Sequence, residues 1–249
     1  MDPAPKPGGG FIKLSGAILD LVYPRTCLGC AQVVDAAQGH LCHDCIAGNL
    51  FITLPYCDIC GFPVSGRIDH AYTCNQCVEH PPQFDLARSA VRYEGVLREA
   101  IHAFKYQQAI WLQEDLGDFL EAVYNTQWEP GQFDAVIPVP LHPRRRRHRG
   151  FNQAALLGQS LSKRINTPII LKKLTRIRYT ASQTRLTKAG RLQNLKGAFQ
   201  VHAADDFNGV RRVLLVDDVM TTGATISECA RALKQAGVEQ VVALTLARG

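Results

Sequence analysis

Two kinds of hydrophobic pattern alternate along the last two thirds of the chain. Short apolar runs typical of strands occur at residues 86–93, 135–139, 168–171, 212–216 and 240–246. Between them, apolar residues recur every three or four positions, which predicts two helices within 96–124 and further helices over 152–165 and 225–235. This alternation predicts an α/β fold with a mainly parallel sheet covered by helices. Ligands of such folds bind at the carboxyl ends of the strands.

The first 23 residues have a different pattern. Residues 1–10 are rich in proline and glycine, which predicts a flexible tail, and residues 11–23 have the periodicity of a short amphipathic helix. Lys13 and Asp20 interrupt this stretch, so it falls short of the roughly 18 uncharged apolar residues that a membrane-spanning helix needs. Asp2 stands where a secretory signal would carry positive charge. We therefore expect a cytoplasmic chain without an integral membrane segment.

Eight of the nine cysteines form four Cys-x-x-Cys pairs, all before residue 80. The pairs are Cys27 and Cys30, Cys42 and Cys45, Cys57 and Cys60, and Cys74 and Cys77. Each pair can turn two thiolates toward one metal ion, and two pairs complete the tetrahedron that zinc prefers. A redox site needs only one pair, and disulfides are rare in the cytoplasm. The pattern therefore predicts two structural zinc ions with no open catalytic position.

The spacing of the pairs leaves the order of ligation open. In sequential ligation the first two pairs hold one ion and the last two hold the other, whereas a cross-brace interleaves them. We favour sequential ligation. The resulting domain plan has a tail and short helix over 1–23, a double zinc ribbon over 24–82 and the α/β domain over 83–249. The ninth cysteine, Cys229, stands at helical spacing with Ile226 and Leu233, which predicts a buried packing residue.

Positive charge is concentrated in one part of the chain. With 46% hydrophobic and 20% charged residues the composition is that of an ordinary globular protein. Of the 28 lysines and arginines, 15 lie within residues 135–204, which contain no Asp or Glu. The other residues carry the remaining 13 bases and all 22 acids. A segment so basic attracts polyanions or phosphate groups through a salt-dependent field, while a solvated basic loop is the alternative for any single arginine run.

A thirteen-residue motif, 213–225, begins in one of the predicted strands. Four apolar residues lead into Asp217 and Asp218, and a helix opens after a turn of Thr221, Thr222, Gly223, Ala224 and Thr225. Adjacent carboxylates can accept hydrogen bonds from the vicinal hydroxyls of a ribose. The turn offers threonine hydroxyls and the N–H groups of a helix N-terminus to a phosphate. A capped helix after a buried strand would explain one threonine but not two carboxylates, so we predict a ribose-phosphate site with a catalytic Asp217–Asp218 pair.

The motif resembles the phosphoribosylpyrophosphate motif of type I phosphoribosyltransferases. Further segments look like those of the ComF/GntX competence family: the cysteine pairs, residues 93–95, 105–106, 136–140 and 149–153, and Gln183, Arg191, Asn194 and Phe199. The resemblance extends over residues 14–248. It implies a type I phosphoribosyltransferase fold that binds 5-phosphoribosyl-1-pyrophosphate with Mg²⁺. It also implies a role in natural transformation, with single-stranded DNA as partner.

Related folds suggest how the remaining basic residues contribute. Residues 138–150 take the place of the loop that holds pyrophosphate, and we expect Arg144, Arg145 and Arg149 to contact the ligand because guanidinium groups bind phosphate oxygens in pairs. The surplus arginines could form a track for a nucleic-acid backbone. Residues 176–196 resemble the hood loop that closes over substrate, with Gln183 and Arg191 as expected contacts. A basic loop without a catalytic part is the alternative.

Three functions are consistent with these features. We favour a protein that binds 5-phosphoribosyl-1-pyrophosphate and handles single-stranded DNA during natural transformation, with competence proteins as further partners. The sequence does not decide whether such a protein catalyses a transfer. A metabolic phosphoribosyltransferase acting on a base or amine is the second, although no base-recognition segment is identifiable. The third is a non-catalytic adaptor whose zinc ribbons bind nucleic acid or a protein, against which the retained Asp217–Asp218 pair argues.

Overall fold

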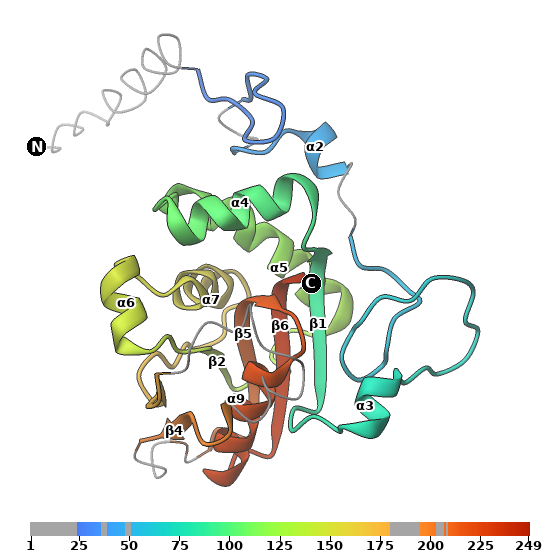
Figure 1. The fold of residues 1–249 in the computed structure, drawn as a ribbon, viewed down its shortest axis with the longest axis vertical. Helices are drawn as coiled ribbons and strands as arrows, with labels where there is room; N and C mark the ends of the chain where they lie inside the picture. Colours follow the sequence, from blue (N-terminus) through green and yellow to red (C-terminus); the bar gives the residue numbers. More distant parts are fainter. Residues whose placement is uncertain (1–23, 36–38, 48–50, 180–194, 203–206, 208) are drawn as a thin grey trace, which may run out of the picture. The chain divides into compact units, whose positions relative to one another are not determined.

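The computed structural model describes residues 24–35, 39–47, 51–179, 195–202, 207 and 209–249. These belong to two compact units, Met1–Gly48 and Asn49–Gly249, and each unit is described by itself (Figure 1). The helix expected over 11–23 and the expected ligand contacts Gln183 and Arg191 lie outside the described residues.

The larger unit is built on a four-stranded sheet with the order β1-β6-β5-β2 (Figure 1). Its strands are β1 (Leu86–Arg92), β2 (Ala135–Pro138), β5 (Arg212–Met220) and β6 (Gln240–Arg248). All three neighbouring pairs are parallel. The central strand β6 is buried along almost its whole length, as is the first half of β5. Burial on both faces explains why their sequences are continuous apolar runs.

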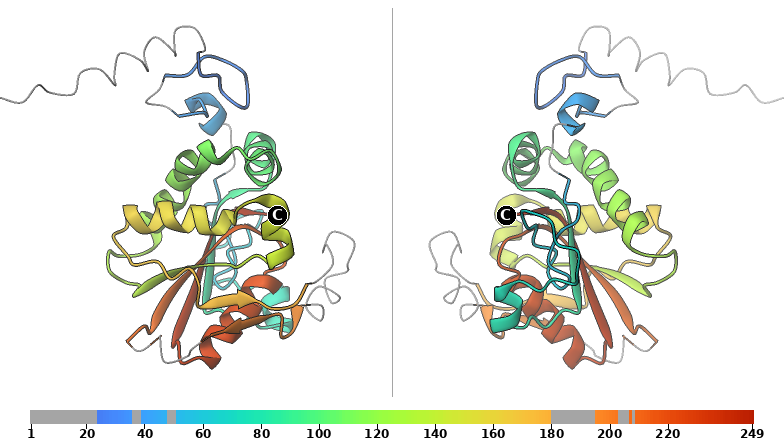
Figure 2. Two further views of the ribbon diagram at one scale, coloured as in Figure 1. Left: turned by 90° about the vertical axis from the view of Figure 1, so that its left-hand side faces the viewer. Right: turned by 90° about the vertical axis from the view of Figure 1, so that its right-hand side faces the viewer.

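Helices cover both faces of this sheet. They are α5 (Gln113–Gln127), α7 (Gln153–Arg164) and α9 (Ala224–Gln235). Before α5 come a further helix, α4 (Gly95–Tyr106), and a 3-10 turn, η2 (Ile110–Leu112). The helices α5 and α7 pack on each other and on one face, and α9 packs on the other (Figure 2). In α9 the buried residues Ile226, Cys229 and Leu233 form one stripe at helical spacing. The predicted α/β fold and the buried position of Cys229 are confirmed.

Two strand predictions differ from the structure in extent. The strand predicted to end at residue 216 continues to Met220, because β6 continues beside it and Met220 stands opposite Arg248. Asp217 and Asp218 therefore lie inside a paired strand and not just beyond its end. Of the strand predicted at 168–171, only Ile169 forms a bridge, with Val136 of β2.

The arginine run that we predicted as a loop is a helix, α6 (Pro143–Arg149). Proline at the first helical position has a suitable φ and no N–H to satisfy, and the His142 ring accepts a hydrogen bond from the Arg144 N–H at 3.2 Å. Arginine is a good helix former, and Gly150, with φ of 87°, ends the helix. The expectation of a loop came from the place of residues 138–150 in related folds, whereas local helix propensity decides the conformation.

An antiparallel hairpin that the sequence did not predict flanks the segment expected to be a hood. Its strands are β3 (Leu174–Arg176) and β4 (Phe199–Val201), with Arg176 opposite Phe199. Residues 180–194, which make up most of the expected hood, lie outside the described residues. Three-residue strands are too short to show a periodicity of two in the sequence.

The second half of the cysteine module belongs to the same compact unit as the sheet. Phe51 bridges Val91 of β1, and the Ala87 N–H of β1 donates to the Ile59 carbonyl at 2.8 Å. Gly61 has φ of 65°, and a Cβ there would lie 2.7 Å from the Ala87 carbonyl oxygen, so this close approach requires glycine. The cysteines Cys57, Cys60 and Cys77 join the main hydrophobic core, and α3 (Asn75–Glu79) carries Cys77. The domain boundary between residues 82 and 83 stays a prediction.

The smaller unit has a core of its own. Cys27, Val34 and Cys42 are buried together, and Thr26 and Val33 form an antiparallel bridge. A single short helix, α2 (His43–Ala47), follows among its described residues.

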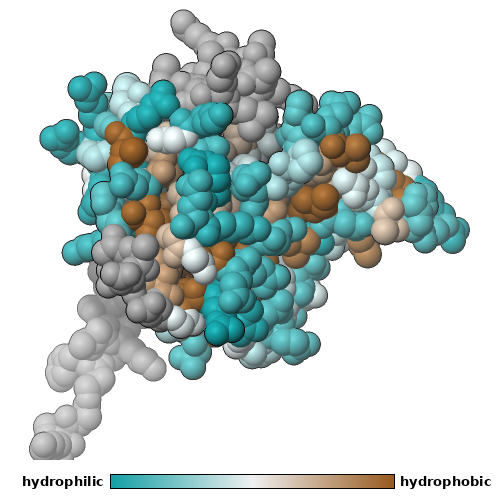
Figure 3. All heavy atoms as spheres, turned by 90° about the horizontal axis from the view of Figure 1, so that it is seen from below, coloured by the Kyte–Doolittle hydropathy of each residue, from teal (hydrophilic) through white to brown (hydrophobic). Residues whose placement is uncertain are grey.

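The described surface is mixed in character. On the face shown in Figure 3, hydrophobic side chains occur in separate groups among hydrophilic ones. Within the described ranges, every helix is too short or too polar to cross a bilayer.

Candidate functional site

The eight paired cysteines gather into two groups of four. The groups are Cys27, Cys30, Cys42 and Cys45, and Cys57, Cys60, Cys74 and Cys77, and within each the Sγ atoms lie within 4.8 Å of one another. The Sγ atoms of Cys30 and Cys42 are 3.6 Å apart, and those of Cys60 and Cys74 are 3.7 Å apart. A tetrahedral zinc with Zn–S bonds of about 2.3 Å needs separations of about 3.8 Å. Both groups fit structural zinc, and the cysteines are grouped in the order that sequential ligation predicts.

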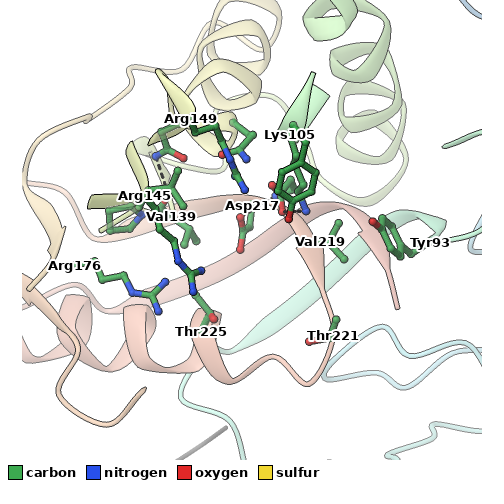
Figure 4. Close-up of a pocket in the computed structure, with 16 residues that line it drawn as sticks. Tyr93, Lys105, Val139, Arg145, Arg149, Arg176, Asp217, Val219, Thr221 and Thr225 are labelled. Atoms are coloured by element: carbon green, nitrogen blue, oxygen red, sulfur yellow. Dashed lines mark hydrogen bonds and ion pairs between the residues drawn. The ribbon is translucent and has the colours of Figure 1, made fainter. Parts of the chain in front are cut away.

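A pocket of about 350 Å³ opens at the carboxyl ends of β1, β2 and β5 (Figure 4). Six of the predicted contacts line it: Asp217, Asp218, Thr221, Thr225, Arg145 and Arg149. A smaller cavity of about 70 Å³ adjoins it and is lined by the rest of the turn, Thr222, Gly223 and Ala224. Of the described predicted contacts, only Arg144 lines neither cavity. We call the larger cavity the inner pocket.

The two carboxylates at the end of β5 have different environments. Successive side chains of a strand point to opposite sides. Asp218 forms an ion pair with Lys105 of α4, with 2.9 Å between Lys105 Nζ and Asp218 Oδ1, and both side chains are only 14% exposed. Asp217 instead lies at the centre of the inner pocket in Figure 4, and its Oδ1 accepts the Asp218 N–H at 2.9 Å. One carboxylate is thus held by a cation, while its neighbour faces the space for a ligand.

This arrangement raises the pKa values of both Asp217 and Lys105. Burial raises the pKa of Asp217 to about 8, and the adjacent Asp218 charge contributes in the same direction. The Asp217 side chain lines the inner pocket, but protein atoms pack around most of its carboxyl group. Burial disfavours the charged form of Lys105, but the charge and hydrogen bond of Asp218, together with the Asp217 charge, outweigh this and raise the pKa of Lys105 above its ordinary value. In the absence of ligand, Asp217 is therefore mostly protonated at pH 7 while Lys105 and Asp218 form an ion pair.

The turn before α9 contains a glycine in a left-handed conformation. Gly223 has φ of 75°, and a Cβ there would lie 2.7 Å from Cε of Met220. The left-handed conformation favours glycine, whereas the Met220 methyl group, at the end of a flexible side chain, could move aside. The helix that follows has twelve residues, and its N-terminal N–H groups and dipole favour an anion at this turn.

The second zinc ribbon braces this turn from outside the pocket. Gln76, on α3 between two zinc ligands, donates from Nε2 to the Thr222 carbonyl at 2.8 Å. Arg248 at the end of β6 is buried, donates to the Thr221 carbonyl and lies 4.0 Å from Cys60 Sγ. The residues joined by the Gln76 bond are 146 positions apart in the chain, so no local pattern in the sequence could have indicated it.

Replacement of Gln76 by Ala is expected to weaken binding of a phosphorylated ligand at the turn about fivefold, because a neutral hydrogen bond contributes about 1 kcal/mol. Zinc content should stay at two ions per chain, since the Gln76 side chain is not a ligand. Calorimetric titration measures the affinity and elemental analysis the zinc. Gln132→Ala, whose side chain accepts from the Glu129 N–H, is the matched control. An unchanged affinity in Gln76→Ala would show that the turn holds its shape without the ribbon.

A basic wall faces the carboxylates. In the view of Figure 4, Arg145, Arg149 and Arg176 lie on one side of Asp217 and Lys105 on the other. The first two come from α6 and Arg176 from β3. Burial, with the nearby Arg145 charge, lowers the pKa of Arg176 below its ordinary value. A ligand in the inner pocket is therefore enclosed between carboxylates and guanidinium groups.

Sequence reasoning missed Lys105, Arg176 and Arg248 as members of this site. Lys105 occurred in a segment noted for resemblance, but the spacing gave no sign of its ion pair with Asp218. Arg176 was one of many bases in the basic segment. Lys105, Arg176 and Arg248 reach the site only because the elements that carry them, α4, β3 and β6, come together in the fold.

Two known domain families match the two parts of this architecture. Residues 18–78 match the double zinc ribbon domain and residues 152–249 the phosphoribosyl transferase domain. Over 225 residues the chain is 33% identical to Competence protein F of Haemophilus influenzae, with 89% of this chain and 96% of that protein covered. The chain belongs to the ComF family. The assignment predicted from the sequence, with its phosphoribosyltransferase fold, is confirmed.

Other members of the ComF family are similar over almost their whole length. The chain is 31% identical over 233 residues to the DNA utilization protein YhgH of Escherichia coli K12, covering 92% of this chain and 99% of that protein. It is 27% identical over 254 residues to Competence protein ComFC of Bacillus subtilis, covering 97% and 98%. In this ComF chain, the residues matched to the phosphoribosyl transferase domain supply the carboxylates and the turn. Lys105, Arg145 and Arg149 precede that match.

Proposed function

We propose that this protein binds 5-phosphoribosyl-1-pyrophosphate with Mg²⁺ and handles single-stranded DNA in the cytoplasm during DNA uptake. The observation that carries the proposal is the Asp217–Asp218 pair, placed beside the Thr221–Thr225 turn and facing Arg145 and Arg149. The names of the relatives, competence protein and DNA utilization protein, support the assignment to DNA uptake.

Each part of the ligand has chemically matched residues. The ribose hydroxyls donate to Asp217 and Asp218. The 5-phosphate accepts from the backbone N–H groups and threonine hydroxyls of the turn. Arg145 and Arg149 bind pyrophosphate oxygens, for which guanidinium groups have suitable geometry. Mg²⁺, when bound with the ligand, neutralises the charge of the pyrophosphate and suits a site rich in oxygen atoms.

The charge of the basic segment supports a nucleic-acid partner. One pyrophosphate needs fewer than the five arginines of α6, and Arg146 and Arg147 are exposed on this helix. Phosphate contacts from such a helix give a sequence-independent affinity that falls with salt. Arg146 and Arg147 do not line the inner pocket, and a transferase for a small base or amine would not need them.

Affinity for 5-phosphoribosyl-1-pyrophosphate and Mg²⁺ is expected to rise with pH up to about 8 and then level off. The ribose hydroxyls and the metal favour ionised Asp217, whose pKa in the free protein is about 8, so binding below that pH releases a proton. Calorimetric titration at pH 7 in two buffers of different ionisation enthalpy measures the number of protons released on binding. In Asp217→Asn both the proton release and the rise should disappear.

The same titrations separate the proposed function from its alternatives. The proposed result is that the protein binds 5-phosphoribosyl-1-pyrophosphate without releasing pyrophosphate from it. Adding single-stranded DNA to this complex, without a base or amine, should not cause release either. Rapid pyrophosphate release with a free base or amine would instead indicate a metabolic transferase. An absence of ligand binding at every pH would leave the non-catalytic adaptor.

A further inference from the structure

A second pocket, of about 540 Å³, lies beside the inner pocket between the end of α4 and the helix α6. All its lining residues except Gln108 are aromatic or basic: Lys105, Tyr106, Arg144, Arg145, His148, Arg149 and Tyr179. Among the described residues that line it there is no carboxylate. We call it the outer pocket. It also accounts for Arg144, which does not reach the inner pocket.

Two tyrosine rings are exposed in the outer pocket next to guanidinium groups. Tyr106 is 63% exposed and Tyr179 is 53% exposed. The guanidinium carbon of Arg149 lies 5.0 Å from the centre of the Tyr106 ring, and that of Arg144 lies 5.4 Å from the centre of the Tyr179 ring. An exposed aromatic face stacks on a nucleobase, and an adjacent guanidinium binds the attached phosphate.

The charge of the outer pocket favours a polymer over a single nucleotide. Lys105 lines the pocket, but its ion pair with Asp218 balances its charge, so the arginines supply the net positive field. Arg146 and Arg147 are exposed on the same helix outside the pocket. A mononucleotide could engage only part of this helix, whereas consecutive phosphates of a strand could engage arginines inside and outside the pocket.

We propose that the outer pocket binds one nucleotide of a single-stranded nucleic acid, with its base stacked on Tyr179, which lines only this pocket, and its phosphate on the arginines of α6. This rests on the proposed function and adds the place where the strand meets the phosphoribosyl site. Stacking is tolerant of sequence because every base has an aromatic face, so the pocket reads single-strandedness and not a particular base.

The two pockets share a wall. Lys105, Tyr106, Arg145 and Arg149 line both of them. A pyrophosphate in the inner pocket and a strand phosphate in the outer pocket therefore draw on the same guanidinium groups, and the two anions repel each other. Each ligand weakens the other, and by linkage the factor is the same in both directions.

Replacing Tyr179 by Ala tests the outer pocket, because Tyr179 does not line the inner one. The probe is a short single-stranded DNA carrying 2-aminopurine, whose fluorescence is quenched when the base stacks. We expect about tenfold weaker binding and loss of the quench in Tyr179→Ala, as for loss of one stacked base. The salt slope should not change, whereas Arg144→Ala should lower it by about one. Tyr179→Phe should bind as the wild type does.

Ile177→Ala is the matched control, because Ile177 is also exposed, stands two residues away and does not line either pocket. Full affinity for the strand in Tyr179→Ala would overturn the outer pocket. Equal affinity for inorganic polyphosphate of the same charge would overturn stacking, and equal affinity for deoxyadenosine monophosphate would overturn the choice of a strand. Binding of the strand unaffected by saturating 5-phosphoribosyl-1-pyrophosphate and Mg²⁺ would overturn the shared wall.

Failure of this inference is distinguishable from failure of the proposed function. Tyr179→Ala should bind 5-phosphoribosyl-1-pyrophosphate as the wild type does, whatever its affinity for DNA. If the wild type bound no single-stranded DNA at all, the outer pocket and the DNA part of the proposed function would both be wrong. The phosphoribosyl site would still be tested by its own titration.

Discussion

The Asp217→Asn, Asp218→Asn double variant is expected to bind 5-phosphoribosyl-1-pyrophosphate about 100-fold more weakly than the wild type. Each carboxylate accepts a charge-assisted hydrogen bond from the ribose, and each such bond contributes about 1.5 kcal/mol. Asn keeps the shape but lacks the charge. Calorimetric titration in the presence of Mg²⁺ measures the loss.

The fold of these variants must be checked, because the double variant leaves the largely buried Lys105 without the Asp218 charge. Asp217→Asn alone keeps that ion pair, and at pH 7 Asn resembles the protonated carboxyl that the free protein already has. We expect it to melt at the wild-type temperature and still to bind about tenfold more weakly, as for one lost charge-assisted bond. Asp69→Asn with Glu239→Gln removes two exposed carboxylates and should leave the affinity unchanged.

Loss of the second cysteine cluster is expected to unfold the larger unit. Cys57 and Cys60 are buried in the same core as the sheet, so their replacement by Ser removes a zinc ion and places polar groups inside that core. Structural zinc binding contributes roughly 10 kcal/mol or more, which is comparable with the whole stability of a typical domain. Circular dichroism should show loss of most helix signal at 25 °C, with one zinc ion or fewer per chain.

Cys27→Ser with Cys30→Ser is the matched control for this prediction. It removes the same number of thiolates, but from the smaller compact unit. We expect the loss of one zinc ion with retention of the cooperative melt and of phosphoribosyl-ligand binding. Equal damage from both pairs of substitutions would contradict different structural roles for the two clusters.

The elements that the sequence predicts best are those with long, uniform patterns. The buried runs of β1 and β6 and the apolar stripe of α9 were read correctly because a single period extends over seven residues or more. The hairpin of β3 and β4 was missed because three residues do not establish a period. The arginine helix α6 was missed because its sequence, without apolar residues after Pro143, has no amphipathic pattern at all.

Local motifs predicted candidate ligand residues that the structure brings together at one pocket, but they did not predict the electrostatics of the site. Asp217, Asp218 and the turn were recognisable because they are contiguous. The ion pair of Lys105 with Asp218 and the bond from Gln76 to Thr222 join residues more than one hundred positions apart. Their formation depends on how the strands pair and how the second ribbon packs. A pattern of residue types along one chain does not contain that information.

The most direct test of the central claim is a calorimetric titration of 5-phosphoribosyl-1-pyrophosphate and Mg²⁺ into the full-length wild type and the Asp217→Asn, Asp218→Asn variant. The phosphoribosyl site predicts saturable binding of one ligand per chain in the wild type and an affinity about 100-fold lower in the variant, as for two lost charge-assisted bonds. Undiminished affinity in a folded variant, or no binding to the wild type, would contradict it.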